Sequence, residues 1–239
     1  MTIIKEERIG GQRLILGDCL KVMPLLGKVD AVVTDPPYGI KQDKGFSGAG
    51  GFSGAGGFSK PVERRQYKGG WDGDRPSVET IHAFIDMSDS HIVWGGQFFA
   101  DVLSAQGRWL FWDKCMTMPT YGDGELAWTS LDGASVKQFT YSGNGMQARE
   151  KGRVHPTQKP VALMEWCLGF LPNATTILDP FMGSGTTLVA CEKLGRNGIG
   201  IELDPDYFEI ACKRVDEATR QPDMFVTPPV APVQDGFDI

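Results

Sequence analysis

The chain has few of the residues that build metal centres and disulfide frameworks. Its 239 residues include five cysteines and three histidines. The cysteines are odd in number, scattered, and never spaced as Cys-x-x-Cys, which argues against a disulfide framework and a zinc site. The histidines stand too far apart in the sequence to indicate a cluster, so no metal is expected. Scattered, reduced cysteines of this kind indicate a cytoplasmic protein.

Long apolar runs are also missing. No stretch approaches the length of a membrane span, and the first residues do not have the pattern of a signal peptide, so no membrane contact is expected. With 41% hydrophobic residues the chain can still bury a core of ordinary size. We expect one domain over residues 1–219. Prolines and a lack of periodicity predict a disordered tail over residues 220–239.

The chain has no overall excess of positive charge. Its formal net charge of −6 argues against a protein that coats nucleic acid non-specifically. Two segments, 60–75 and 137–159, are nevertheless locally basic, and such a face on an acidic protein is compatible with DNA. The side chains predicted to contact DNA are Lys60, Arg64, Arg65, Lys68, Arg149, Lys151 and Arg153.

The most informative short motif is Asp35-Pro36-Pro37-Tyr38. It follows the apolar run 29–34, which predicts a buried parallel strand, and ligands of open α/β sheets bind at the carboxyl ends of such strands. The prolines fix the backbone, so a carboxylate and an aromatic ring are held in one geometry. That pair suits a flat, polar substrate with an N–H group, such as a nucleobase. Taken alone, the motif is equally compatible with a tight turn that leaves a strand.

A second pattern joins a strand, a glycine turn and a helix over residues 176–194. The glycines allow the backbone to approach a ligand, and the N-terminus of a helix favours a carboxylate or phosphate. Glu202 closes the next predicted strand about 20 residues later, where an acid commonly holds ribose hydroxyls. This geometry fits either a dinucleotide or S-adenosylmethionine. Asp18, at the end of the strand 13–16, is either a helix cap or a carboxylate within reach of the cofactor.

The remaining patterns predict further elements of an α/β protein. Residues 39–75 contain a repeat of Gly-Phe-Ser-Gly-Ala-Gly, which predicts a mobile loop above the site. Asp132-Gly133 predicts a hairpin that pairs residues 126–130 with 136–141. Further strands are expected at 91–94, 108–113 and 198–202, and helices at 76–89, 98–103, 160–171 and from Asp204 to about Arg214.

Three motifs together carry a family resemblance. Asp35-Pro36-Pro37-Tyr38 comes first, His155-Pro156-Thr157-Gln158-Lys159-Pro160 follows, and the glycine turn Asp179–Thr187 comes last. In this order they resemble the circularly permuted β group of DNA amino-methyltransferases, which act on adenine N6 or cytosine N4. The resemblance runs from about Leu14 to Arg214.

The resemblance implies a fold, a cofactor and a set of site residues. The fold is a Rossmann-like α/β domain whose mostly parallel, seven-stranded sheet includes an antiparallel strand, and the cofactor is S-adenosylmethionine. The catalytic residues are Asp35, Pro36, Pro37 and Tyr38. The cofactor contacts are Asp18, Cys19, Asp35, His155, Thr157, Lys159, Asp179, Pro180, Phe181, Gly183, Ser184, Gly185, Thr186, Thr187, Glu202 and Leu203.

The implied activity is methyl transfer to a base that has left the duplex. Asp at the first position of the motif favours adenine N6, because cytosine N4 enzymes of this family more often carry Ser there. Only a short segment, about residues 113–154, is left for target recognition, which predicts a short or relaxed recognition sequence in double-stranded DNA. The protein is expected to act as a monomer or homodimer, and any restriction partner is expected to be encoded elsewhere.

Several other interpretations stay open at this point. Cytosine N4, an RNA or a protein amide could be the methyl acceptor, and an NAD-dependent oxidoreductase would use the same glycine turn and Glu202. A catalytically silent DNA-binding module is a further alternative. The tail peptide Gln221-Pro222-Asp223-Met224-Phe225 resembles the short segments with which bacterial proteins bind the replication sliding clamp.

Overall fold

The computed structural model describes residues 2–40, 74–115, 122–141 and 158–220. Several sequence predictions lie outside these residues: the glycine-rich repeat, His155, Thr157, the seven basic residues expected at the DNA, and the clamp-like segment Gln221–Phe225. The described residues contain no helix that is both long enough and apolar enough to cross a membrane.

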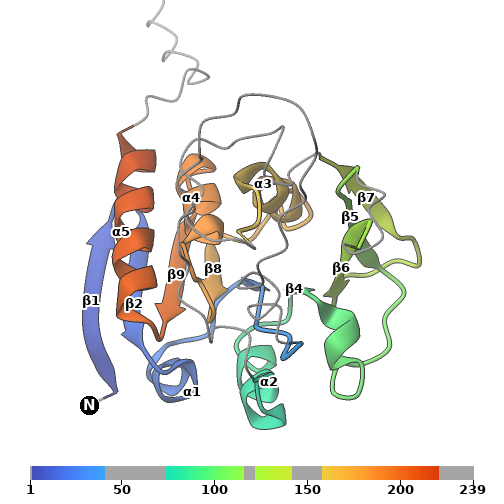
Figure 1. Cartoon of the computed structure of the whole chain (residues 1–239), viewed down its shortest axis with the longest axis horizontal. Coiled ribbons are helices and arrows are strands. Elements are labelled where there is room, and N and C mark those ends of the chain that lie inside the picture. Colours follow the sequence, from blue (N-terminus) through green and yellow to red (C-terminus); the bar gives the residue numbers. More distant parts are fainter. Residues whose placement is uncertain (1, 41–73, 116–121, 142–157, 221–239) are drawn as a thin grey trace, which may run out of the picture.

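One mixed sheet organises the described chain (Figure 1). Nine strands of the described residues lie in the order β1-β2-β9-β8-β3-β4-β6-β5-β7. Five neighbouring pairs are parallel, and the pairs β1–β2, β4–β6 and β5–β6 are antiparallel. The bounds are β1 Ile3–Ile9, β2 Gln12–Gly17, β3 Ala31–Thr34, β4 His91–Trp94, β5 Trp109–Asp113, β6 Gly124–Thr129, β7 Lys137–Thr140, β8 Thr176–Asp179 and β9 Asn197–Glu202.

Helices cover both faces of this sheet. The longer helices α3 (Val161–Gly169), α4 (Thr186–Lys193) and α5 (Pro205–Thr219) lie side by side on one face (Figure 1). The opposite face packs against α1 (Cys19–Val22), α2 (Val78–Ile85) and two short 3₁₀ turns, η1 (Met23–Leu25) and η3 (Gly96–Phe99). Because both faces are covered, the central strands are apolar throughout rather than alternating with polar residues.

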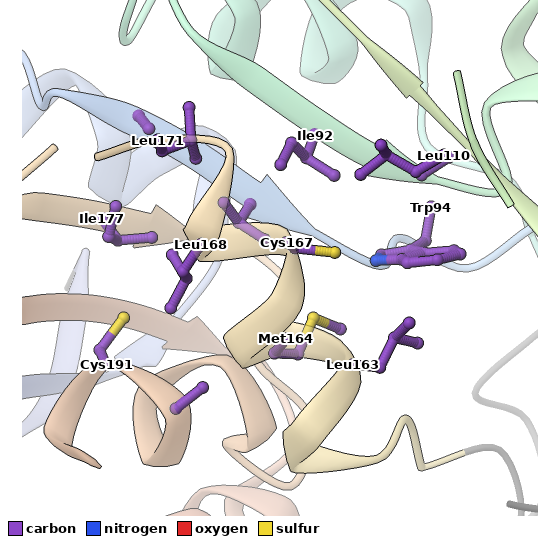
Figure 2. Packing of buried hydrophobic residues seen from close by; sticks show 14 of the residues in the cluster. Ile92, Trp94, Leu110, Leu163, Met164, Cys167, Leu168, Leu171, Ile177 and Cys191 are labelled. Atoms are coloured by element: carbon purple, nitrogen blue, oxygen red, sulfur yellow. The ribbon is translucent and has the colours of Figure 1, made fainter. Parts of the chain in front are cut away.

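The strand period of two sends successive side chains to opposite faces of the sheet. In β3, Val32 packs among residues of α1 and α2, whereas Val33 packs toward α3. Figure 2 shows the core between the sheet and α3, in which Trp94 of β4 lies against Leu163 and Cys167 of α3. Burial of these side chains fixes the position of β3 and β4, and therefore of the segments that leave their carboxyl ends.

The predicted Rossmann-like α/β class is confirmed, but the predicted number of seven strands is wrong. The edge strand β1 was not expected, because its sequence Ile-Ile-Lys-Glu-Glu-Arg-Ile lacks the apolar alternation of a half-buried strand. Ile3 and Ile9 pack against the core at the two ends of β1, and one charged pair crosses the antiparallel ladder. The two carboxylate oxygens of Glu6 each accept a hydrogen bond from the Arg13 guanidinium of β2, both at 2.9 Å. Such pairs contribute to sheet stability without any apolar pattern.

The predicted hairpin between residues 126–130 and 136–141 is also wrong. Strand β5 lies between β6 and β7, antiparallel to the first and parallel to the second. The apolar β5 takes the interior position, where Leu110 and Trp112 are buried, whereas the largely exposed β7 takes the edge. Asp132-Gly133 is therefore part of a crossover, in which the guanidinium of Arg108 fills the space beside Gly133.

The helices lie where the sequence predicted them, but some differ from the prediction in length. The strand Thr176–Asp179 is found where it was predicted. Helix α5 continues to Thr219 rather than ending near Arg214, and α2 is confined to Val78–Ile85 within the predicted span 76–89. Residues 98–103 do not form the predicted helix, and the 3₁₀ turn η3 ends at Phe99.

Candidate active site

The carboxyl ends of four parallel strands meet at a cavity of about 820 Å³. Strands β2, β9, β8 and β3 are neighbours in the sheet, and each contributes the residues at or just after its last position. The motifs that are far apart in the sequence are brought together because β3 and β8 pair directly, with Val32 opposite Leu178.

The cavity gathers nearly all of the predicted site residues that the structure describes. Those that line it are Asp18, Cys19, Asp35, Pro36, Pro37, Tyr38, Lys159, Asp179, Pro180, Phe181, Gly183, Ser184, Thr186, Thr187, Glu202 and Leu203. Gly185 is the exception. It begins α4 with a φ of +77°, and a Cβ at this position would lie 3.0 Å from the Cβ of Ala211 in α5. Gly185 therefore allows close packing of α4 on α5 and is not among the residues that line the cavity.

The glycine turn after β8 is open toward the cavity at Gly183. This residue has a φ of +50°, and nothing lies within 4 Å of the place a Cβ would take. Arg214 of α5 stabilises the turn. Its guanidinium donates to the backbone oxygen of Ser184 at 2.6 Å and to the hydroxyl of Thr186 at 3.1 Å. The sequence motif does not contain Arg214, so only the fold reveals its contribution to the turn.

Glu202 ends β9 beside the glycine turn and holds three backbone N–H groups. Its Oε2 accepts from Gly183 at 2.9 Å, and its Oε1 accepts from Leu203 and Asp204 at 2.9 and 2.8 Å. Burial raises the pKa of the Glu202 carboxyl to about 6, although the backbone donors lower it. A carboxylate oxygen has two lone pairs, so Oε2 retains capacity for a further donor from the cavity.

Asp179 is the buried acid at the end of β8. Its Oδ1 accepts from the Thr34 hydroxyl at 2.8 Å and from the backbone N–H of Phe181 at 3.1 Å. Burial raises the pKa of this carboxyl to about 6 as well, partly opposed by the hydrogen bonds of Thr187 and Thr34. Asp179 thus connects the glycine turn to β3, the strand that carries Asp35.

Asp18 caps α1, as one of the two interpretations predicted, and it also lines the cavity. Its Oδ1 accepts from the backbone N–H of Leu20 at 3.1 Å, so it caps α1, and its carboxylate forms an exposed ion pair with Lys21. The same residue lines the cavity at the end of β2, and so does Cys19. Burial raises the pKa of the Cys19 thiol to about 11, which keeps it protonated at neutral pH.

The motif Asp35–Tyr38 leaves β3 at the mouth of the cavity. The Tyr38 hydroxyl donates to Oδ1 of Asp35 at 2.5 Å, and the Lys159 ammonium donates to Oδ2 at 2.6 Å. The Tyr38 ring stacks on Phe98 of η3 with 4.9 Å between ring centroids. A base that stacks on Tyr38 must therefore take the face opposite Phe98 or displace that ring.

Gly95 sets the position of the Tyr38 ring. It has a φ of +68° at the end of β4, and a Cβ there would lie 2.0 Å from Cε1 of Tyr38. The sequence pattern marked Gly95 only as the end of a strand. The structure shows that the absence of a side chain is what lets the Tyr38 ring reach Asp35.

Two charged residues that the motifs did not predict complete the site. Glu125 of β6 lies 2.8 Å from the Lys159 ammonium through its Oε2, and its Oε1 forms an ion pair with Lys114. The Lys159 side chain is only 4% exposed. Burial alone would lower the pKa of Lys159, but Asp35 and Glu125 raise it above its ordinary value, so this ammonium stays charged.

The pKa values of the two carboxyls around Lys159 are shifted in opposite directions. Burial raises the pKa of Asp35, and the neighbouring Lys159 only partly offsets that rise. Burial acts on Glu125 in the same sense, but Lys159 and Lys114 together bring the pKa of Glu125 down to about 2.

The charges of the cavity limit what it can hold. Among the described residues that line it, six are acidic (Asp18, Asp35, Glu125, Asp179, Glu202 and Asp204) and two are lysines (Lys114 and Lys159). A cavity with this excess of carboxylates favours a cationic ligand that donates hydrogen bonds. It disfavours a pyrophosphate, because the N–H of Gly183 at the turn is already used by Glu202. This argues against the dinucleotide-dependent oxidoreductase.

Comparison with known proteins agrees with this geometry. Residues 92–213, about half of the chain, match the model of the DNA methylase family, which groups N6 and N4 methyltransferases. The chain belongs to this family. A DNA methylase is what the three sequence motifs predicted, and that prediction of a DNA amino-methyltransferase is confirmed.

Individual relatives extend the match over most of the DNA methylase chain. The type II methyltransferase M.HpaI of Haemophilus parainfluenzae is 28% identical, over 86% of this chain and 74% of its own. Among solved structures, that of the M1.HpyAVI–SAM complex covers 86% of this chain and 99% of its own at 23% identity, with a TM-score of 0.55. The cytosine-N4-specific PvuII DNA methyltransferase covers 96% and 92% at 14% identity, with a TM-score of 0.57. At these identities the two structures support the fold alone.

Proposed function

We propose that this DNA methylase transfers the methyl group of S-adenosylmethionine to the N6 amino group of an adenine that has left the duplex. The observation that carries the proposal is the carboxylate of Asp35 at the end of β3. It lies in the cavity that also contains the glycine turn and Glu202. One cavity can therefore hold the cofactor and the target amine next to each other.

The residues present fit S-adenosylmethionine as the cofactor. When bound, it supplies a methyl group on a positively charged sulfur. The open side of Gly183 leaves room for the methionine end, and Glu202 and Asp18 are acceptors at the ends of β9 and β2 for ribose hydroxyls and the adenine amine. Because S-adenosylmethionine is cationic and rich in donors, the acidic cavity described above favours it.

Asp35 and Pro36 prepare the target amine. An exocyclic amine conjugated to a purine is a poor nucleophile, because its lone pair is delocalised into the ring. Acceptance of its two N–H groups by the Asp35 carboxylate and the Pro36 carbonyl favours a lone pair that points toward the methyl group. Orientation of the two reactants then supplies much of the acceleration, and no covalent bond between enzyme and base is required.

Tyr38 holds the plane of the base. Stacking of a base on an aromatic ring contributes about 1–3 kcal/mol and does not depend on the identity of the base. Tyr38 can therefore position adenine or cytosine, and the preference for adenine rests on Asp at position 35. Methylation of cytosine N4 would use the same acceptors and the same cavity.

Product analysis tests the proposal. Purified protein is incubated with labelled S-adenosylmethionine and unmethylated genomic DNA, and the digested nucleosides are identified. We expect N6-methyladenine from the wild type, none from Asp35→Asn, and full activity from Asp101→Asn. Asp101 is a matched control, because it forms an exposed ion pair with Arg75 away from the cavity. N4-methylcytosine would overturn the substrate, and activity in Asp35→Asn would overturn the role of Asp35.

A further inference from the structure

The proposed reaction uses Asp35 but leaves one buried and two half-buried charges near it unexplained. Lys159 lies just before α3, Glu125 is in β6, and Lys114 directly follows β5. Side-chain exposures are 4% for Lys159, 23% for Glu125 and 15% for Lys114. Burial of charges is costly unless they are paired, and apolar residues of similar size would stabilise the fold at least as well. Their presence next to Asp35 therefore calls for a functional explanation.

The geometry of the three residues forms a continuous chain of ion pairs. Lys114 contacts Oε1 of Glu125, Oε2 of Glu125 lies 2.8 Å from Lys159, and Lys159 lies 2.6 Å from Oδ2 of Asp35. With Asp35 included, two cations alternate with two anions, so the group is neutral as a whole. Glu125 and Lys159 are each paired on both sides, whereas Lys114 and Asp35 end the chain, and Asp35 lines the cavity.

The ammonium of Lys159 contacts three groups, two through hydrogen bonds and the third, Glu125, through an ion pair. It donates to Asp35 at 2.6 Å and to the Tyr38 hydroxyl at 3.3 Å, and it forms the 2.8 Å ion pair with Glu125. A flexible lysine that contacts three fixed groups is held in one orientation. Glu125 supplies the only one of these three contacts that does not belong to the catalytic motif.

We propose that Glu125 is a positioning residue for methyl transfer, which acts through Lys159 on Asp35 and is itself fixed by Lys114. Glu125 holds the Lys159 ammonium in place, and this ammonium keeps Asp35 correctly positioned. Glu125 also shares the positive charge of Lys159, so that Asp35 remains a strong acceptor for the amine of the base. The inference rests on the proposed role of Asp35 and adds a residue that lies outside all three motifs.

The proposal has a consequence for pH dependence with a definite sign. The titratable groups that face Asp35 are the neutral Tyr38 hydroxyl from its own loop and the charged Lys159 from before α3, Glu125 from β6 and Asp179 from β8. Transfer requires ionised Asp35, so the rate falls on the acid side as Asp35 becomes protonated. Removal of the negative Glu125 leaves Lys159 to act on Asp35 alone, which lowers the pKa of Asp35. Removal of Lys159 has the opposite effect.

The test is the pH profile of methyl transfer at saturating S-adenosylmethionine and DNA. For Glu125→Gln we expect the acid limb to move to lower pH by about one unit, as for removal of a nearby charge. We expect the maximal rate to fall about tenfold, as when an outer partner of a functional side chain is removed. For Lys159→Met we expect the acid limb to move to higher pH. Glu165→Gln is the matched control, because Glu165 of α3 pairs with Lys193 of α4 and does not line the cavity. This variant should leave the pH profile unchanged.

The other possible outcomes would overturn either the inference about Glu125 or the proposed function. A lower rate in Glu125→Gln with an unmoved acid limb would mean that Glu125 only supports the fold, and it would overturn the inference. Should Glu125→Gln not fold, as judged by its melting temperature and S-adenosylmethionine affinity, Lys114→Gln takes its place. Lys114→Gln leaves the negative charge of Glu125 without its second cation, so it must move the acid limb to higher pH by a smaller amount, and no movement would overturn the inference. An active Asp35→Asn would instead overturn the proposed function on which the inference rests.

Discussion

The ammonium of Lys159 lies 2.6 Å from a carboxylate oxygen of Asp35, although 124 residues separate the two in the sequence. Asp35 follows β3, and Lys159 directly precedes α3, which packs on the same sheet near β3. The contact joins the second of the three sequence motifs to the first. It places a cation beside the carboxylate that we propose to be catalytic, whereas the motif predicted Lys159 only as a cofactor contact.

Tyr38 offers a way to separate two effects of one side chain. Tyr38→Phe removes the hydroxyl that donates to Asp35 and keeps the ring, whereas Tyr38→Ala removes both. We expect Tyr38→Phe to lower the rate of transfer about fivefold, since one hydrogen bond contributes about 1 kcal/mol. We expect Tyr38→Ala to lose about a further tenfold, within the range for loss of base stacking. Single-turnover transfer to an oligonucleotide measures both, and equal rates in the two variants would contradict the stacking role.

The sequence was sufficient for the parts of the site that short motifs encode. Asp35, Asp179 and Glu202 each end an apolar strand, and the rule that ligands bind at such ends placed all three at one cavity. The glycine turn was also identified, because positive φ values restrict its positions to glycine. Gly183 and Gly185 both have such values, yet only Gly183 lines the cavity, and the sequence cannot distinguish them.

The residues that the sequence did not reveal depend on strand register. Glu125 reaches Lys159 because β6 pairs with β5 so that Glu125 lies opposite Trp112. A shift of one residue in this register would send Glu125 to the other face of the sheet. The predicted hairpin had a different neighbour for β6, so it could not have placed Glu125. Long-range pairing is decided by packing of the whole sheet and not by local pattern.

Gly183 provides a test of the cofactor cavity with a matched control. Gly183 and Gly195 both have a positive φ, of +50° and +64°, and neither has an atom within 4 Å of a Cβ position. Alanine at either site should lower the free energy of unfolding by about 1 kcal/mol through backbone strain alone. Only Gly183→Ala places a methyl group in the cavity, so we expect it to weaken S-adenosylmethionine binding about tenfold, a typical cost of overpacking. Calorimetric titration measures the affinity of each variant for S-adenosylmethionine. Equal affinities in the two variants would place the methionine end of the cofactor elsewhere.

Gly95 gives a test of how the Tyr38 ring is positioned. A Cβ at Gly95 would lie 2.0 Å from the Tyr38 ring, so Gly95→Ala forces the ring to move. We expect methyl transfer to fall about as far as in Tyr38→Ala, with cofactor affinity unchanged, because Gly95 does not touch the glycine turn. Gly195→Ala again controls for backbone strain. Transfer at the wild-type rate in Gly95→Ala would show that the position of the ring seen here is not the one used in catalysis.

The affinity for S-adenosylmethionine should depend on pH with a sign set by Glu202 and Asp179. Burial raises the pKa of each carboxyl to about 6. If both carboxylates lie at the bound cofactor, their charged forms accept its hydrogen bonds and attract its positive charge. Above pH 7 both are ionised and the Kd should be constant. As the pH falls through 6 they become protonated, and we expect binding at pH 5 to be about tenfold weaker than at pH 7. Glu202→Gln should bind more weakly at pH 7 and lose part of this dependence, and the part that remains belongs to Asp179. A Kd that does not change between pH 7 and pH 5 in the wild type would mean that neither carboxylate contacts the cofactor.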